Sequence, residues 1–93
     1  MINNSITLLD NGCCVDTDFL NLVRNAVKRG LPLLIPQKKY PLKDICGKGF
    51  WKQLDDGQRR SAGWCMTHLV SRQEVPLMFS GKNSSNSNTY MLV

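Results

Sequence analysis

The spacing of apolar residues predicts a first helix over residues 16–30. Five apolar residues recur at i, i+3, i+4, i+7 and i+8, which is one face of a helix: Phe19, Leu22, Val23, Ala26 and Val27. Asp16 and Asp18 stand where helix caps are expected. Gly30 predicts a left-handed stop, and Pro32 prevents the helix from resuming.

A second helix is predicted from Gly57 to about residue 71 or 72. Its apolar stripe has the same spacing: Ala62, Cys65, Met66 and Leu69. Asp55 or Asp56 supplies the cap. A glycine inside a helix costs about 1 kcal/mol relative to alanine. Gly63 therefore predicts the close approach of another backbone, which belongs either to a neighbouring helix or to a ligand.

Short elements are expected between the two helices. Leu31 to Ile35 is an apolar run bracketed by prolines, which predicts a brief extended segment. Pro41 suits the first turn of a short helix that ends at Gly47. A further apolar cluster follows, made of Phe50, Trp51 and Leu54.

The two ends of the chain predict β-structure. Apolar runs at 75–79 and 89–93, separated by a polar loop at 80–88, are typical of a hairpin with a long tip. Near the N-terminus, Ile6 to Leu9 precede an Asp-Asn-Gly turn, which indicates an edge strand or a packed arm. We therefore expect one α+β domain over 1–93, mainly helical, with an N-terminal arm at 1–15 and a C-terminal β-hairpin.

Charge narrows the classes of partner. The chain of 93 residues has a net charge of +5. Between Lys38 and Arg60, seven lysines and arginines face three aspartates, which places +4 of that charge in one quarter of the chain. A basic stretch favours a polyanion, because bound phosphates release counterions. The alternative is a solvated helix face without a ligand.

The sequence also predicts the compartment. The N-terminus lacks the basic start and apolar core of a signal peptide, and no apolar run approaches the roughly 20 residues that span a bilayer. We expect a cytoplasmic protein with no membrane partner. Its four cysteines are then expected to be reduced thiols.

Metal and catalytic sites are poorly supported by the residue pattern. Cys65 and His68 stand at i and i+3, with Cys46 as a third candidate ligand. A structural zinc site usually shows two close ligand pairs, and only one is present. Buried thiols explain Cys46 and Cys65 better. We therefore expect no metal, no cofactor and no enzymatic activity. The alternative is a small metal-dependent enzyme, which would be indicated if metal copurified in stoichiometric amount.

Two surfaces are candidates for binding. The first is the outward face of the 57–72 helix, which carries Arg59, Arg60, Trp64, Thr67, His68 and Ser71. Arginines in a first helical turn can reach bases or phosphates in a DNA groove; alternatively they are solvated or pair with Asp55, Asp56 or Glu74. Trp64 either stacks on a ligand or fills the interface with the first helix. The second surface is the polar loop 81–88, which suits phosphates or has no role.

These motifs together resemble a known class of protein. The run Leu42 to Leu54, the helix opening Gly57-x-Arg59-Arg60-x-Ala62-Gly63, Leu69-Val70, the segment Gly81-Lys82-Asn83-Ser84-Ser85 and Tyr90 are similar to small winged helix-turn-helix proteins of bacteria, phages and mobile elements. The resemblance covers 40–93 and implies a winged-helix core there. It makes 57–72 the recognition helix and 80–89 the wing. The connection containing Gly47 and Gly49 is longer than the 3–4-residue turn of the standard motif.

The resulting hypothesis is a small regulatory protein that binds double-stranded DNA and controls transcription. Arg59, Arg60, Thr67 and His68 would face the groove, while Lys48, Lys52, Lys82 and Asn83 would hold phosphates. A homodimer is expected through the 17–29 helix or the N-terminal arm. The alternative is a protein-binding adaptor or inhibitor, a phage or mobile-element factor acting on a host protein. That alternative predicts an exposed apolar patch, with Trp51 or Trp64 in it.

Overall fold

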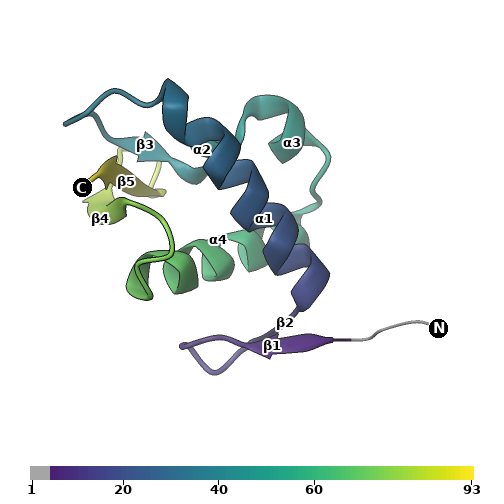
Figure 1. Cartoon of the computed structure of the whole chain (residues 1–93). Helices are drawn as coiled ribbons and strands as arrows, with labels where there is room; N and C mark the ends of the chain where they lie inside the picture. The colour runs from purple at the N-terminus through teal and green to yellow at the C-terminus, as the bar shows by residue number, and fades with distance from the viewer. Residues whose placement is uncertain (1–4) are drawn as a thin grey trace.

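Four α-helices and two small antiparallel sheets form a compact α+β domain in residues 5–93, the part of the chain described by this computed structural model. Figure 1 shows the elements, which follow in the order β1 (Ile6–Leu8), β2 (Cys14–Asp16), α1 (Thr17–Gly30), the 3₁₀ turn η1 (Leu31–Leu33), β3 (Tyr40–Pro41), α2 (Leu42–Cys46), α3 (Lys48–Lys52), α4 (Asp56–Ser71), β4 (Leu77–Lys82) and β5 (Asn88–Leu92). The predicted α+β class is confirmed. Residues 1–4 of the predicted arm lie outside the described part.

The two long helices begin directly after the aspartates that were predicted to cap them, Asp16 and Asp55. The Asp16 carboxylate accepts a hydrogen bond from the Asp18 N–H at the start of α1. At the start of α4, Asp55 and Gln58 form a reciprocal capping box. These caps satisfy backbone donors that have no partner within the helix. Both predicted helices are therefore confirmed, α4 to within one residue at either end.

The core lies where α1, α2 and α4 meet the C-terminal sheet. Its fully buried side chains include Ile45 from α2, Val23 and Val27 from α1, and Met66 and Leu69 from α4. The stripe predicted for α1 is wrong at one position, because Leu20 is buried while Leu22 is 55% exposed. Since α1 packs against both α2 and α4, its buried face is rotated away from Leu22.

Gly30 is required for a different reason from the one that the sequence indicated. Its φ is −79°, which is right-handed, so the predicted left-handed stop is wrong. A Cβ atom at this position would lie 1.9 Å from the carbonyl oxygen of Ile45. The glycine thus permits α1 to approach the backbone of α2. The chain then continues into η1 instead of the predicted extended segment, and the Leu34 N–H donates to the Leu31 carbonyl.

The C-terminal hairpin is confirmed and belongs to a three-stranded sheet of order β3-β5-β4. Tyr90 of β5 stands opposite Tyr40 of β3 on one side and Phe79 of β4 on the other. The register shifts between Phe79 and Lys82, where Gly81 has a φ of +88°. Because the strands extend to Lys82 and from Asn88, the connecting loop is 83–87, shorter than the predicted 80–88.

The N-terminal arm is a second hairpin, made of β1 and β2. Thr7 stands opposite Val15 in the antiparallel pair. Leu9 and Val15 are buried, so the hairpin is packed against the helical body. Figure 1 places it beside the start of α1, below the helices in that view. Of the two alternatives for this segment, Ile6–Leu8 form an edge strand, and Leu9 after it is packed into the core. None of the helices in 5–93 combines the length and the apolar character needed to cross a membrane.

Two helical glycines give a matched test of this packing. We expect Gly30→Ala to lower the free energy of unfolding by about 1–3 kcal/mol, because the new methyl group would overlap the Ile45 carbonyl. Gly63→Ala is the control, since a Cβ there meets no atom within 4 Å, and it should raise stability by about 1 kcal/mol. Urea denaturation of both variants measures the two effects. Equal stability of the variants would contradict the assigned contact.

Candidate functional site

The outward face of α4 carries few side-chain contacts of its own. Arg60 and Thr67 are exposed there, on the side of the helix opposite the buried stripe. Gly63 lies between them in the same helical row. Within residues 5–93, no side chain or neighbouring backbone would meet a Cβ at Gly63. The predicted approach of a neighbouring helix is therefore wrong, and the backbone of α4 is open on this face.

Two neighbouring depressions lie between this face and the C-terminal hairpin; together we call them the α4–hairpin trough. The first part, of about 330 Å³, is lined from α4 by Gly63, and from other elements by Pro41, Leu42, Lys43, Trp51, Ser87, Asn88 and Tyr90. The second part, of about 380 Å³, is lined by Thr67, Val70, Ser71, Phe79, Asn88 and Tyr90. Asn88 and Tyr90 belong to both. Among the residues that the structure describes, no aspartate or glutamate lines either part.

Tyr90 holds the centre of the trough. It is a buried residue of the middle strand, and its ring meets Phe79 edge-on with centroids 6.2 Å apart. Burial raises the pKa of the Tyr90 phenol, an effect that hydrogen bonding to Asn88 and Thr67 partly opposes. The phenol is therefore protonated near neutral pH. Tyr90 lies between the hairpin and α4, because it lines one cavity with Gly63 and the other with Thr67.

The Arg59 side chain makes contacts to other residues of the domain. Its Nε and Nη2 both donate to the carbonyl oxygen of Trp51 at 3.3 Å, and its guanidinium lies 5.9 Å from the centroid of the Trp51 ring. Nη1 lies 3.8 Å from a carboxylate oxygen of Asp56. This pairing with Asp56 is the alternative that the sequence left open. The side chain ties the end of α3 to the first turn of α4 and positions Trp51 at the trough.

The predicted phosphate-binding residues come from three elements. Lys48 and Lys52 are exposed on α3, and Lys82 is exposed at the end of β4. Asn83 follows Lys82, but its Oδ1 accepts hydrogen bonds from the Ser85 and Ser87 N–H groups at 2.9 and 3.0 Å. This amide oxygen shapes the tip and is occupied there. Trp64, which the sequence left open, is half-buried and packs against the core.

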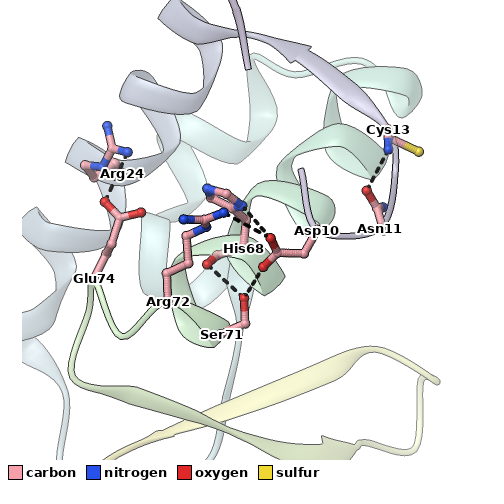
Figure 2. Close-up of polar contacts among 8 residues, drawn as sticks. All are labelled: Asp10, Asn11, Cys13, Arg24, His68, Ser71, Arg72 and Glu74. Carbon is pink, nitrogen blue, oxygen red and sulfur yellow. Dashed lines mark hydrogen bonds and ion pairs between the residues drawn. The ribbon is translucent and has the colours of Figure 1, made fainter. Parts of the chain in front are cut away.

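His68 does not face a groove, so this prediction is wrong. Only 6% of the residue is exposed. Its Nδ1 lies 3.9 Å from Oδ1 of Asp10, which belongs to the turn between β1 and β2 (Figure 2). The N-terminal hairpin covers this side of α4. Nothing in the sequence indicated that the N-terminal hairpin buries His68, since Asp10 and His68 are far apart along the chain.

Asp10 is the centre of a polar cluster that fastens the N-terminal hairpin to α4 (Figure 2). The Ser71 hydroxyl donates to Asp10 Oδ2 at 2.7 Å, and Arg72 Nη2 lies 3.3 Å from Oδ1. The Ser71 hydrogen bond holds the pKa of Asp10 below its usual range; burial opposes this, and the charges of Arg72 and His68 add to it. Beside the cluster, Arg24 pairs with Glu74 at 3.2 Å.

The cluster contains the residue types of a serine hydrolase triad without its geometry. In such a triad the serine hydroxyl is hydrogen-bonded to the histidine ring. Here the Ser71 hydroxyl contacts Asp10 and the backbone carbonyl of His68. Nδ1 of His68 has no hydrogen-bond partner among the described residues. The arrangement is that of a structural fastening.

The thiols and the remaining acidic groups do not assemble a metal site. Cys46 and Cys65 are buried, as predicted, and burial raises their thiol pKa values to about 12 and about 11. Both are therefore protonated near neutral pH and poorly reactive. Among residues 5–93, no three histidine, cysteine, aspartate or glutamate side chains are close enough together to hold a metal ion.

Comparison with protein families gives one match. Residues 26–91, more than half of the chain, match the model of the domain of unknown function DUF1413. The chain belongs to the DUF1413 family. The matched region contains every lining residue of the α4–hairpin trough, whereas Asp10 and the N-terminal hairpin precede it. No curated protein and no solved structure matches the chain.

The contribution of the Asp10 contacts to stability can be tested by varying the pH. We expect Asp10→Asn to lower stability at pH 7, because the lowered pKa of Asp10 means that its ionised form is favoured in the folded state. This stabilisation is fully present above the usual aspartate pKa of about 3.9. It is lost as the pH falls through the lower pKa of the folded state.

The difference between wild type and Asp10→Asn should therefore shrink in urea titrations as the pH is lowered from 7 towards 3. Asp44→Asn is the control, because Asp44 is exposed on α2 and has no side-chain hydrogen bond or ion pair within the described residues. A pH-independent loss in Asp10→Asn would contradict a contribution from the charge.

Proposed function

We propose that this member of the DUF1413 family is a small DNA-binding regulatory protein of the winged helix-turn-helix type, and that the α4–hairpin trough receives the phosphate backbone of a duplex. The observation that carries the proposal is the composition of the trough. It runs beside an exposed helix face, ends at a hairpin tip, and is lined by no carboxylate. An anion can therefore enter without meeting like charge.

The order of elements supports a winged helix. α2, α3 and α4 are followed by the β4–β5 hairpin, and the sheet order β3-β5-β4 places the central strand against both neighbours. The long connection before α4 is accounted for by α3, which fills the interval between Gly47 and the Asp55 cap. In this proposal α4 is the recognition helix and residues 83–87 are the tip of the wing.

The distribution of charge supports an anionic ligand at this face. Lys43 lines the trough, and Lys48, Lys52 and Lys82 are exposed on the elements that border it. A separate groove at the N-termini of α1 and α4 is instead lined by Asp16, Asp18 and Asp55. The two grooves thus differ in sign, and only the first suits phosphates.

The roles of the site residues follow from their contacts. Arg60 and Thr67 are exposed on α4 and are the proposed contacts to the bases. Gly63 has no side chain between them, which allows a ligand backbone to approach the helix. Arg59 has a positioning role through Trp51. His68 has no role in binding because it is buried.

One observation favours a second candidate, a protein partner in the same trough. Phe79 borders the trough and is 52% exposed, and exposed apolar surface can mark a site of protein contact. Trp51 and Trp64, which the sequence offered for such a patch, are half-buried and pack against the core. The apolar contact would therefore centre on Phe79. This candidate predicts binding that depends weakly on salt.

Fluorescence anisotropy with a mixed-sequence duplex tests the proposal. We expect Arg60→Ala to weaken binding by about 1–3 kcal/mol, and Lys82→Ala to reduce the slope of log K against log salt by about 1. Lys28→Ala is the matched control. It also removes one exposed positive charge, but from the last turn of α1.

Each outcome has a definite meaning. Equal losses in Arg60→Ala, Lys82→Ala and Lys28→Ala would show only the effect of net charge and would contradict binding at the trough. No binding at low salt by the folded protein would exclude DNA and leave the protein partner. In that case Phe79→Ser, but not Met78→Ser on the neighbouring strand position, should abolish binding of the partner.

A further inference from the structure

The acidic groove at the start of α1 is also apolar, and it forms a socket. This groove, of about 640 Å³, is lined by apolar side chains that include Val15, Phe19 and Leu22. Three carboxylates line it as well: Asp16, Asp18 and Asp55. Its remaining lining residues are Cys14, Gly57, Gln58 and Ser61, so no lysine or arginine of the described residues lines it.

Helix capping accounts for only part of these carboxylates. Asp16 and Asp55 each use Oδ1 to accept one backbone hydrogen bond, and both residues remain exposed. A cap keeps its charge, and Asp18 does not cap a helix. Leu22 stays 55% exposed although an aliphatic side chain gains about 1.5–3 kcal/mol on full burial. The socket is therefore suited to an apolar ligand with positive charge around it.

The opposite end of α1 carries a segment of that kind, which we call the knob. Leu33 and Ile35 in the segment after α1 are 81% and 58% exposed. Four exposed basic residues flank them in the sequence: Lys28, Arg29, Lys38 and Lys39. Figure 1 shows this segment, between α1 and β3, projecting from the body at the end of α1 remote from the N-terminal hairpin.

The knob is held in shape by its own contacts. The Ile35 N–H donates to the Tyr40 hydroxyl at 2.9 Å, and the Lys38 ammonium lies 5.3 Å from the centroid of the Tyr40 ring. The Lys38 N–H donates to the Ile35 carbonyl, and Pro32 and Pro36 restrict the backbone. A segment that is already ordered loses little conformational entropy on docking.

We propose that the socket binds the knob of a second copy of this chain, so that copies associate head to tail. Each partner supplies what the other lacks: Leu33 and Ile35 fill an apolar groove, and their flanking lysines meet its aspartates. A two-fold arrangement is disfavoured. Socket against socket would bring two sets of three carboxylates together, and knob against knob would do the same with the basic residues.

The contact is heterologous, because it joins two different surfaces of the same chain. α1 has 14 residues, so socket and knob are separated by about 20 Å along its axis. A heterologous contact forms a ring or an open chain of copies. Neither surface contains a lining residue of the α4–hairpin trough. Self-association and ligand binding therefore do not compete for the same residues, and the inference does not depend on the proposed function.

Two variants test the head-to-tail arrangement, and both alter exposed residues. Leu33→Ser/Ile35→Ser removes the apolar knob, and Leu22→Arg places a positive charge in the socket. By sedimentation velocity at low salt, we expect the wild type to form dimers and larger species as its concentration rises. Each variant alone should remain a monomer. An equimolar mixture should give a 1:1 dimer and nothing larger, because it contains one intact socket and one intact knob.

Met78→Ser is the control, since Met78 is exposed on β4 outside both surfaces, and it should associate as the wild type does. Circular dichroism melts establish that all variants are folded. A wild type that stays monomeric at every concentration would overturn the proposal. So would a mixture that stays monomeric, or variants that still form dimers alone, because these results describe no contact or a two-fold one.

Discussion

Burial of one face of α4 is the constraint on which the rest of the domain depends. Ala62, Cys65, Met66 and Leu69 are fully buried against α1 and the C-terminal sheet. Burial of a large apolar side chain contributes about 1.5–3 kcal/mol, so this stripe determines the rotation of the helix. The same rotation leaves Arg60, Gly63 and Thr67 on the outside. The exposed face is thus a direct consequence of the packing beneath it.

Polar contacts then fix the neighbouring elements relative to α4. At its first turn, Arg59 binds the carbonyl of Trp51 and joins α3 to the helix. At its last turn, Ser71 and Arg72 bind Asp10 and hold the N-terminal hairpin. Between them, Tyr90 of the C-terminal hairpin lines one cavity together with Thr67 and Val70 of the helix. α3 and the N-terminal hairpin are thus fixed to one helix, and each contact uses a side chain that would otherwise be available to a ligand.

Charge is arranged on this scaffold with separate signs at separate surfaces. The α4–hairpin trough is free of carboxylates, while the groove at the starts of α1 and α4 contains three. The region that matches the DUF1413 family contains the trough and the knob. It starts within α1, after the socket residues of that helix. The residues that line the trough and those that line the acidic groove are different.

The elements themselves could be predicted from the sequence because their causes are local. Aspartate caps, helical periodicity and paired apolar runs act over a few residues, so α1, α4 and the C-terminal hairpin follow from them. Contacts between distant segments carry no such signal. Gly30 looked like a left-handed stop, but it makes room for the Ile45 carbonyl. His68 looked like a groove residue, but the turn at Asp10 covers it.

The residues of the candidate site likewise fall into those that the sequence predicted correctly and those that tertiary contacts decided. Arg60, Thr67 and Lys82 are exposed as helix and hairpin patterns indicated, whereas Arg59 and the Asn83 oxygen are used by tertiary and turn contacts. By itself, the sequence determined the two long helices, the C-terminal hairpin and where basic residues concentrate. Only the tertiary structure decided which of those side chains remain free, because burial and pairing depend on what the fold brings beside them.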